Sequence, residues 1–142
     1  MSDKIRQSLI GGIVGTVAMT LITWMSPLMG FPKMSPPDML AGMMGLPVFA
    51  GWVMHFMIGV IFALAYIFLI QKKLQKISNR YAKGVVFGMI VFVFAQIMML
   101  AMGAVFTSMP SPAGSMALIM LGSVIGHVVY GVVVVLFSKD LS

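Results

Sequence analysis

Residues 48–70 read VFAGWVMHFMIGVIFALAYIFLI, with no lysine, arginine, aspartate or glutamate and with one histidine, His55. A helix needs about 20 consecutive apolar residues to cross the hydrocarbon core of a bilayer, so this run predicts a membrane-spanning helix. An ionisable side chain inside such a span is costly to bury and is often functional. The same run therefore indicates that the protein is embedded in lipid, and it contains the first candidate functional residue, His55.

Three further apolar runs occur in the 142-residue chain, and the four predicted spans cover residues 8–29, 48–70, 84–106 and 114–137. With 61% hydrophobic and 8% charged residues, the chain has too much apolar surface for one soluble core. The first run is too long for the apolar region of a signal peptide, so we expect it to remain as a span. The sequence predicts one membrane domain over residues 1–142, an all-α transmembrane four-helix bundle of two helical hairpins.

Positive residues flank the spans and form no stripe with interleaved aromatics, which argues against nucleic acid as a partner. Lys4, Arg6, the central linker at 71–83 and Lys139 fall on one predicted side, and Lys33 falls on the other. The positive-inside rule then predicts cytoplasmic N- and C-termini and a cytoplasmic central linker. We expect a multi-pass protein of the bacterial cell inner membrane, with the lipid bilayer as its main partner.

The two predicted outer loops differ in character. Residues 30–47 contain four prolines, and Ser35 followed by Pro36, Pro37 and Asp38 is typical of a helix N-terminus. We therefore expect a short interfacial helix that ends near Met44. The other loop, residues 107–113, contains two prolines and no charge, which predicts a tight turn.

The two halves of the chain resemble each other at an offset of 72 residues. His55 and Gly59 correspond to His127 and Gly131. Gly12 corresponds to Gly84 in the same way. If the halves are repeats, they are parallel hairpins related by an axis along the membrane normal.

Glycines four residues apart let helix backbones approach closely. Such pairs occur at Gly11/Gly15, Gly84/Gly88 and Gly122/Gly126. They predict a tightly packed bundle, and they suit a homo-oligomer or a place in a larger membrane complex.

His55 and His127 are the only histidines, and both fall within predicted spans. Their helical neighbours one turn away are small, namely Gly51 and Gly59 for His55, and Ser123 and Gly131 for His127. Small neighbours leave the space that a flat macrocycle needs beside a ligating imidazole. One hypothesis is therefore a b-type haem held by both histidines, in a non-catalytic electron carrier of a respiratory or metal-handling assembly.

The competing interpretation is structural. Each histidine would hydrogen-bond a neighbouring helix, and the glycines would simply permit close packing. The candidate partners are Thr16, Thr20, Thr23, Gln96 and Ser123. Counted from the lysines that follow their spans, the two histidines also differ in depth by roughly 7 Å. In this reading the chain is an accessory membrane protein without a cofactor.

Several chemistries are excluded by composition. The chain has no cysteine and no glutamate, and its three aspartates lie outside the spans. Thiolate metal sites, cysteine nucleophiles and carboxylate-coupled transport therefore have no candidate residues. We expect no catalytic residues.

Methionine is abundant, with 17 residues that concentrate in the outer halves of the spans and the outer loops. Thioether and imidazole ligands suit Cu(I), so a copper-handling protein with His55, His127 and Met120 as ligands is a second hypothesis. Methionine also fills irregular gaps in apolar cores, which is the alternative. The outer group is Met25, Met29, Met34, Met39, Met43, Met44, Met102, Met109, Met116 and Met120.

Two motifs carry a resemblance to known proteins. The loop MGFPKM at residues 29–34 and the segment GWVMHFMIG at residues 51–59 resemble an uncharacterised family of small bacterial four-span integral membrane proteins. The resemblance implies the four-span topology. It implies no catalytic or binding residues.

Overall fold

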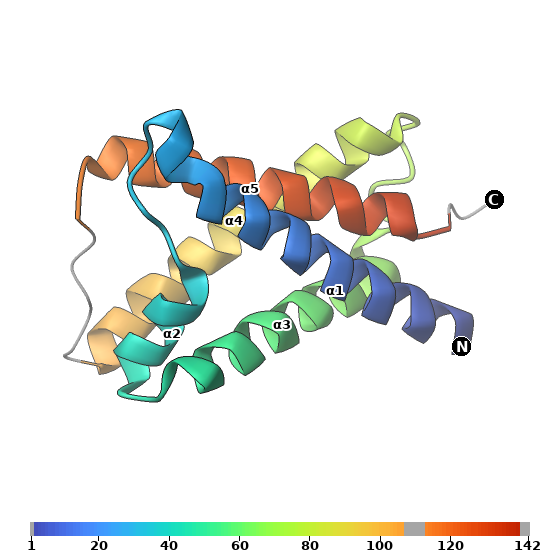
Figure 1. Ribbon diagram of the computed structural model, residues 1–142. Coiled ribbons are helices and arrows are strands. Elements are labelled where there is room, and N and C mark those ends of the chain that lie inside the picture. Colours follow the sequence, from blue (N-terminus) through green and yellow to red (C-terminus); the bar gives the residue numbers. More distant parts are fainter. Residues whose placement is uncertain (1, 107–112, 140–142) are drawn as a thin grey trace.

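The computed structural model describes residues 2–106 and 113–139, and all the regular elements in these ranges are helices (Figure 1). In chain order they are α1 (Ser2–Met25), the 3₁₀-helix η1 (Ser26–Met29), α2 (Pro36–Met44), α3 (Val48–Ala65), the π-helical turn η2 (Tyr66–Ile70), α4 (Arg80–Val105) and α5 (Met116–Phe137). Four helical stretches are long and apolar enough to cross a membrane, namely α1 with η1, α3 with η2, α4, and α5. The predicted all-α, four-span architecture is confirmed.

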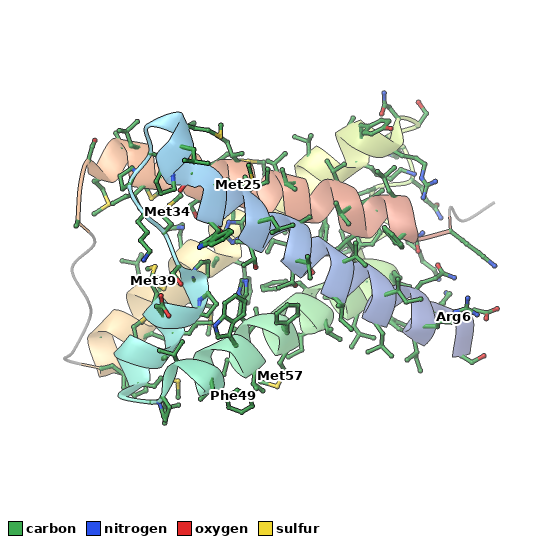
Figure 2. The ribbon with its side chains drawn as sticks, viewed as in Figure 1. Arg6, Met25, Met34, Met39, Phe49 and Met57 are labelled. Carbon is green, nitrogen blue, oxygen red and sulfur yellow. The ribbon has the colours of Figure 1, made fainter. Side chains whose placement is uncertain are left out.

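The helices give the molecule two distinct ends (Figure 1). The start of α1, the end of α5 and the linker 71–79 lie at one end, which we call the basic end because it carries Lys4, Arg6, Lys72, Lys73 and Lys76. The helix α2 and the turn η1 lie at the other, which we call the methionine end because it carries Met25, Met29, Met34, Met39, Met43 and Met44. Figure 2 shows Met25, Met34 and Met39 at this end and Arg6 at the basic end.

The predicted spans agree with the helices to within a few residues at most boundaries. The third begins at Arg80 rather than residue 84, because the Asn79 side chain caps it. The Asn79 Oδ1 atom accepts hydrogen bonds from the backbone N–H groups of Tyr81 and Ala82 at 2.8 and 3.2 Å. These bonds satisfy two donors that have no partner within the helix.

The short helix predicted to end near Met44 is also confirmed, since α2 occupies residues 36–44. Ser35 stands at its N-cap, although its side chain makes no capping bond. The helix does more than lie at an interface, because Pro37, Ala41 and Met43 are buried. A methyl group built on Gly51 of α3 would overlap the Pro37 carbonyl oxygen, so α2 packs directly on α3. The turn predicted at 107–113 lies largely outside the described residues.

Each hairpin is held by the same close helix crossing. A methyl group on Gly12 would lie 2.7 Å from the Cα atom of Val60, and one on Gly84 would overlap the Cα atom of Val132. Val60 and Val132 are themselves 72 residues apart. The same pair of positions thus forms the α1–α3 contact and the α4–α5 contact, which supports the internal repeat.

The two hairpins meet along seams of different composition. Gly15 of α1 lies against the rings and methyls of Tyr130 and Val134 on α5. Between α3 and α4 the contacts are aromatic, with ring centroids 5.6 Å apart for Phe62 and Phe94. A methyl group on Gly11 would lie 3.6 Å from the Cα atom of Val134, so the α1–α5 seam also brings backbones close together, whereas aromatic side chains span the α3–α4 seam.

Polar side chains close the basic end of α5. The Arg80 guanidinium donates hydrogen bonds to the carbonyl oxygens of Val135, Leu136 and Ser138, at 2.7, 3.0 and 2.5 Å. The last carbonyls of a helix lack partners and carry partial negative charge, so a cation there is stabilising. Arg80 thus ties the start of α4 to the end of α5.

The glycine crossings predict unequal responses to a single methyl group. We expect Gly12→Ala and Gly84→Ala each to destabilise the protein by about 1–3 kcal/mol, because the new methyl meets backbone that cannot move aside. Gly11→Ala is the matched control, since its methyl would meet the Phe137 Cβ atom at 3.3 Å. Thermal unfolding in detergent measures the difference. Equal melting temperatures for Gly12→Ala and Gly11→Ala would show that the crossing is looser than described.

The Arg80 cap makes a second prediction. Arg80→Met removes charge-assisted hydrogen bonds to the end of α5 and should cost about 1–3 kcal/mol. Lys73→Met is the control, because Lys73 is exposed in the linker. Chemical denaturation in detergent compares the two variants. An Arg80→Met protein as stable as Lys73→Met would contradict the capping role.

Candidate functional site

The two histidines lie on α3 and α5, which run in the same direction from the methionine end to the basic end. His55 is buried, with 8% of its surface exposed, and His127 is half-buried. On α1, the Thr20 hydroxyl lies 3.0 Å from the Nε2 atom of His55, and Met19 packs on Gly126, which precedes His127. The helices that carry the two predicted site residues thus meet the same turn of α1.

The hydrogen bonds at His55 fix which ring nitrogen carries the proton. The Thr20 hydroxyl lies 2.7 Å from the Thr16 carbonyl oxygen, to which it donates its only proton. The same hydroxyl lies 3.0 Å from the Nε2 atom of His55 and therefore accepts a hydrogen bond from it. In a neutral imidazole, the Nδ1 atom of His55 then carries the lone pair.

His127 has the opposite tautomer. Its Nδ1 atom lies 2.7 Å from the carbonyl oxygen of Ser123, which can only accept, so Nδ1 donates. The lone pair of His127 is therefore on Nε2. The Phe92 ring of α4 meets this imidazole edge-on, with centroids 5.7 Å apart.

Each histidine thus has one nitrogen held by an oxygen and one nitrogen with a lone pair. Metal-ligating histidines are typically oriented in this way, because the outer hydrogen bond sets the tautomer and the ring direction. The repeat is preserved here, since Thr20 beside His55 and Phe92 beside His127 are 72 residues apart. The two rings are thus neutral and oriented, each with one nitrogen available to a ligand.

Atoms of neighbouring helices fill the space beside the small residues that flank the histidines. Gly51 lies under the Pro37 carbonyl, and a methyl group on Gly59 would overlap the Thr16 hydroxyl. On α5, a methyl group on Gly131 would overlap the backbone of α4 at Gly84 and Gly88. A haem does not fit beside the histidines unless α1, α2 or α4 moves away, whereas a single ion needs none of this space.

Other predicted residues lie apart from the imidazoles. Met120 is two turns, or about 10 Å along the axis, from His127, so its role as a ligand stays a prediction. The hydroxyls of Thr16 and Thr23 donate to carbonyls of their own helix, at 2.7 and 3.0 Å. Thr20 is thus the threonine of this series with a hydrogen bond to α3. Gln96 is half-buried on α4.

Sequence reasoning missed two residues. Phe92 contacts His127, and its correspondence to Thr20 in the repeat would have identified it. Met19 is buried in the seam between α1 and α5, although it is not one of the ten outer methionines that the sequence analysis lists. Within residues 2–106 and 113–139, no three His, Asp or Glu side chains are grouped as metal ligands. A metal here would depend on imidazole and thioether donors.

These features define a class: a multi-pass membrane protein with a four-helix bundle and a histidine pair in its interior. The chain belongs to a family of unknown function (DUF6789), whose family model matches residues 2–141. No curated protein and no solved structure shows significant similarity to this chain.

The tautomer at His55 is directly testable. Thr20→Val keeps the shape of the side chain but removes the acceptor, so His55 should lose its preference for a protonated Nε2 atom. Thr20→Ser keeps the acceptor and should keep the preference. Nitrogen-15 NMR of histidine-labelled protein distinguishes protonated from unprotonated ring nitrogens. Identical spectra for the wild type and Thr20→Val would refute the assignment.

Proposed function

We propose that this chain is a small non-catalytic membrane protein of a metal-handling assembly, and that it binds one Cu(I) ion through His55 and His127. The observation that carries this proposal is the complementary hydrogen bonding of the two rings. Thr20 holds one nitrogen of His55 and the Ser123 carbonyl holds one nitrogen of His127. Each ring is left with one lone pair, and neither ring must first lose a proton to bind a metal.

The surroundings favour a monovalent ion. The cost of burying an ion in a low-dielectric medium rises with the square of its charge. No carboxylate or thiolate lies within residues 8–29, 48–70, 84–106 or 114–137 to offset a second charge. Imidazole suits copper, and thioether ligands select Cu(I) in particular. Two neutral imidazoles in a chain rich in methionine therefore fit Cu(I) better than a divalent ion.

The cellular setting follows from charge and exposure. We place the protein in the bacterial inner membrane with the basic end in the cytoplasm, since positive residues favour that side. Much of α4 is exposed, including Val93, Phe94 and Ile97. Lipid, a second copy or a larger membrane complex would cover these side chains.

Copper titration of the purified protein tests the function. Under reducing, oxygen-free conditions in detergent, the wild type should take up one Cu(I) per chain in competition with a chelator. His55→Ala and His127→Ala should each weaken binding by about 100-fold, because a single imidazole cannot hold the ion alone. Phe49→Ala is the control, since Phe49 lies on α3 and points away from the bundle (Figure 2).

Two outcomes would overturn the proposal. The first is a wild-type protein without stoichiometric copper, or histidine variants that bind as the wild type does. The second is a reduced-minus-oxidised spectrum with b-type bands that disappear in both histidine variants. That spectrum would assign the pair to haem and the protein to electron transport.

A further inference from the structure

Two thioethers follow one another along the seam between α1 and α5. Met34, in the loop before α2, covers Gly122: a methyl group there would overlap the Met34 Cε atom and lie 3.4 Å from its Sδ atom. Met19 covers Gly126, where a methyl group would lie 3.4 Å from the Met19 Cγ atom. Gly122 and Gly126 are about 6 Å apart along the axis of α5, so the two methionines lie at successive turns.

The inner methionine lies on the turn of α1 that meets the helices of both histidines. Met19 precedes Thr20, whose hydroxyl binds His55, and it packs on Gly126, which precedes His127. It is buried, with 8% of its surface exposed. Met34, in contrast, is half-buried and lies at the methionine end (Figure 2). The two thioethers are thus offset along α5, with Met34 nearer the methionine end and Met19 at the turn of α1 that carries Thr20.

The opposite direction is closed by aromatic packing. Tyr66 and Phe87 are fully buried, with ring centroids 4.7 Å apart, and both lie on the basic side of the histidines. Tyr130 is 2% exposed and donates a hydrogen bond to the Gly59 carbonyl oxygen at 2.5 Å. These three rings belong to one buried cluster, which begins at Met19 and continues on the basic side of the histidines.

We propose that Met34 and then Met19 form the route by which Cu(I) reaches His55 and His127 from the methionine end. This inference rests on the proposed function. The ion moves by ligand exchange, in which the incoming sulfur or nitrogen bonds to copper as the outgoing donor leaves. Copper stays in the monovalent state throughout, so the route needs no oxidant, reductant or proton. Thioethers suit each step because they are neutral, soft ligands.

The rate of copper loading separates this role from packing. Met34→Leu and Met19→Leu keep the side-chain volume nearly constant and remove the sulfur. The probe is Cu(I) supplied as its bicinchoninate complex to the full-length protein in detergent, followed by stopped-flow absorbance. Each variant should load at least about tenfold more slowly than the wild type. Met57→Leu is the matched control, since Met57 is 54% exposed on α3 and lies away from the seam (Figure 2).

Equilibrium binding to the same samples distinguishes the two proposals. The route predicts slow loading of Met34→Leu and Met19→Leu with an unchanged copper stoichiometry. Wild-type rates in both variants, with stoichiometric binding intact, would overturn the route and leave the histidine site standing. Absence of copper binding by the wild type would overturn both. A Met57→Leu protein as slow as the seam variants would also count against the route.

Discussion

Close backbone contact at glycine holds this bundle together. Lipid tails are as apolar as the helix surfaces, so burial of apolar side chains gives little drive for helix association in a membrane. Dispersion contacts must supply it, and these are strong only where backbones approach closely. The contacts of Gly12 with Val60 and of Gly84 with Val132 provide such an approach in each hairpin. They also set the register, which places Thr20 beside His55.

The glycine–valine helix crossing is the same in both halves of the repeat, but the residues around it differ. One pair of equivalent positions explains why the α1–α5 and α3–α4 seams differ. Position 15 is glycine in the first half, and its counterpart at position 87 is phenylalanine. Gly15 lets Tyr130 approach α1 closely, whereas the Phe87 ring fills the space between α4 and α3 against Tyr66. A parallel repeat thus yields an asymmetric bundle, with a compact α1–α5 seam and an aromatic α3–α4 seam.

The spans, the hairpins and the outer helix could be predicted because each depends on local composition. A run of about 20 apolar residues predicts a membrane span, and prolines after a serine predict a helix start, whatever the rest of the fold is. The orientation of the histidines could not be predicted, since it depends on contacts between helices. The glycines near His55 show the difficulty: the sequence reveals empty volume at Gly51 and Gly59, but not which neighbour fills it. The structure places α2 and Thr16 there.

The bundle is packed differently on the two sides of the histidines. At the basic end, Arg80 and Gln71 donate hydrogen bonds to carbonyl oxygens at and just after the end of α5. The buried rings of Tyr66 and Phe87 lie between this end and the histidines. Toward the methionine end the seam contains flexible thioethers, which can change rotamer at little cost. In the proposed copper site, access from the methionine end alone would hold the ion rather than conduct it. The proposed site would therefore serve copper retention or delivery on one side of the membrane rather than transport across it.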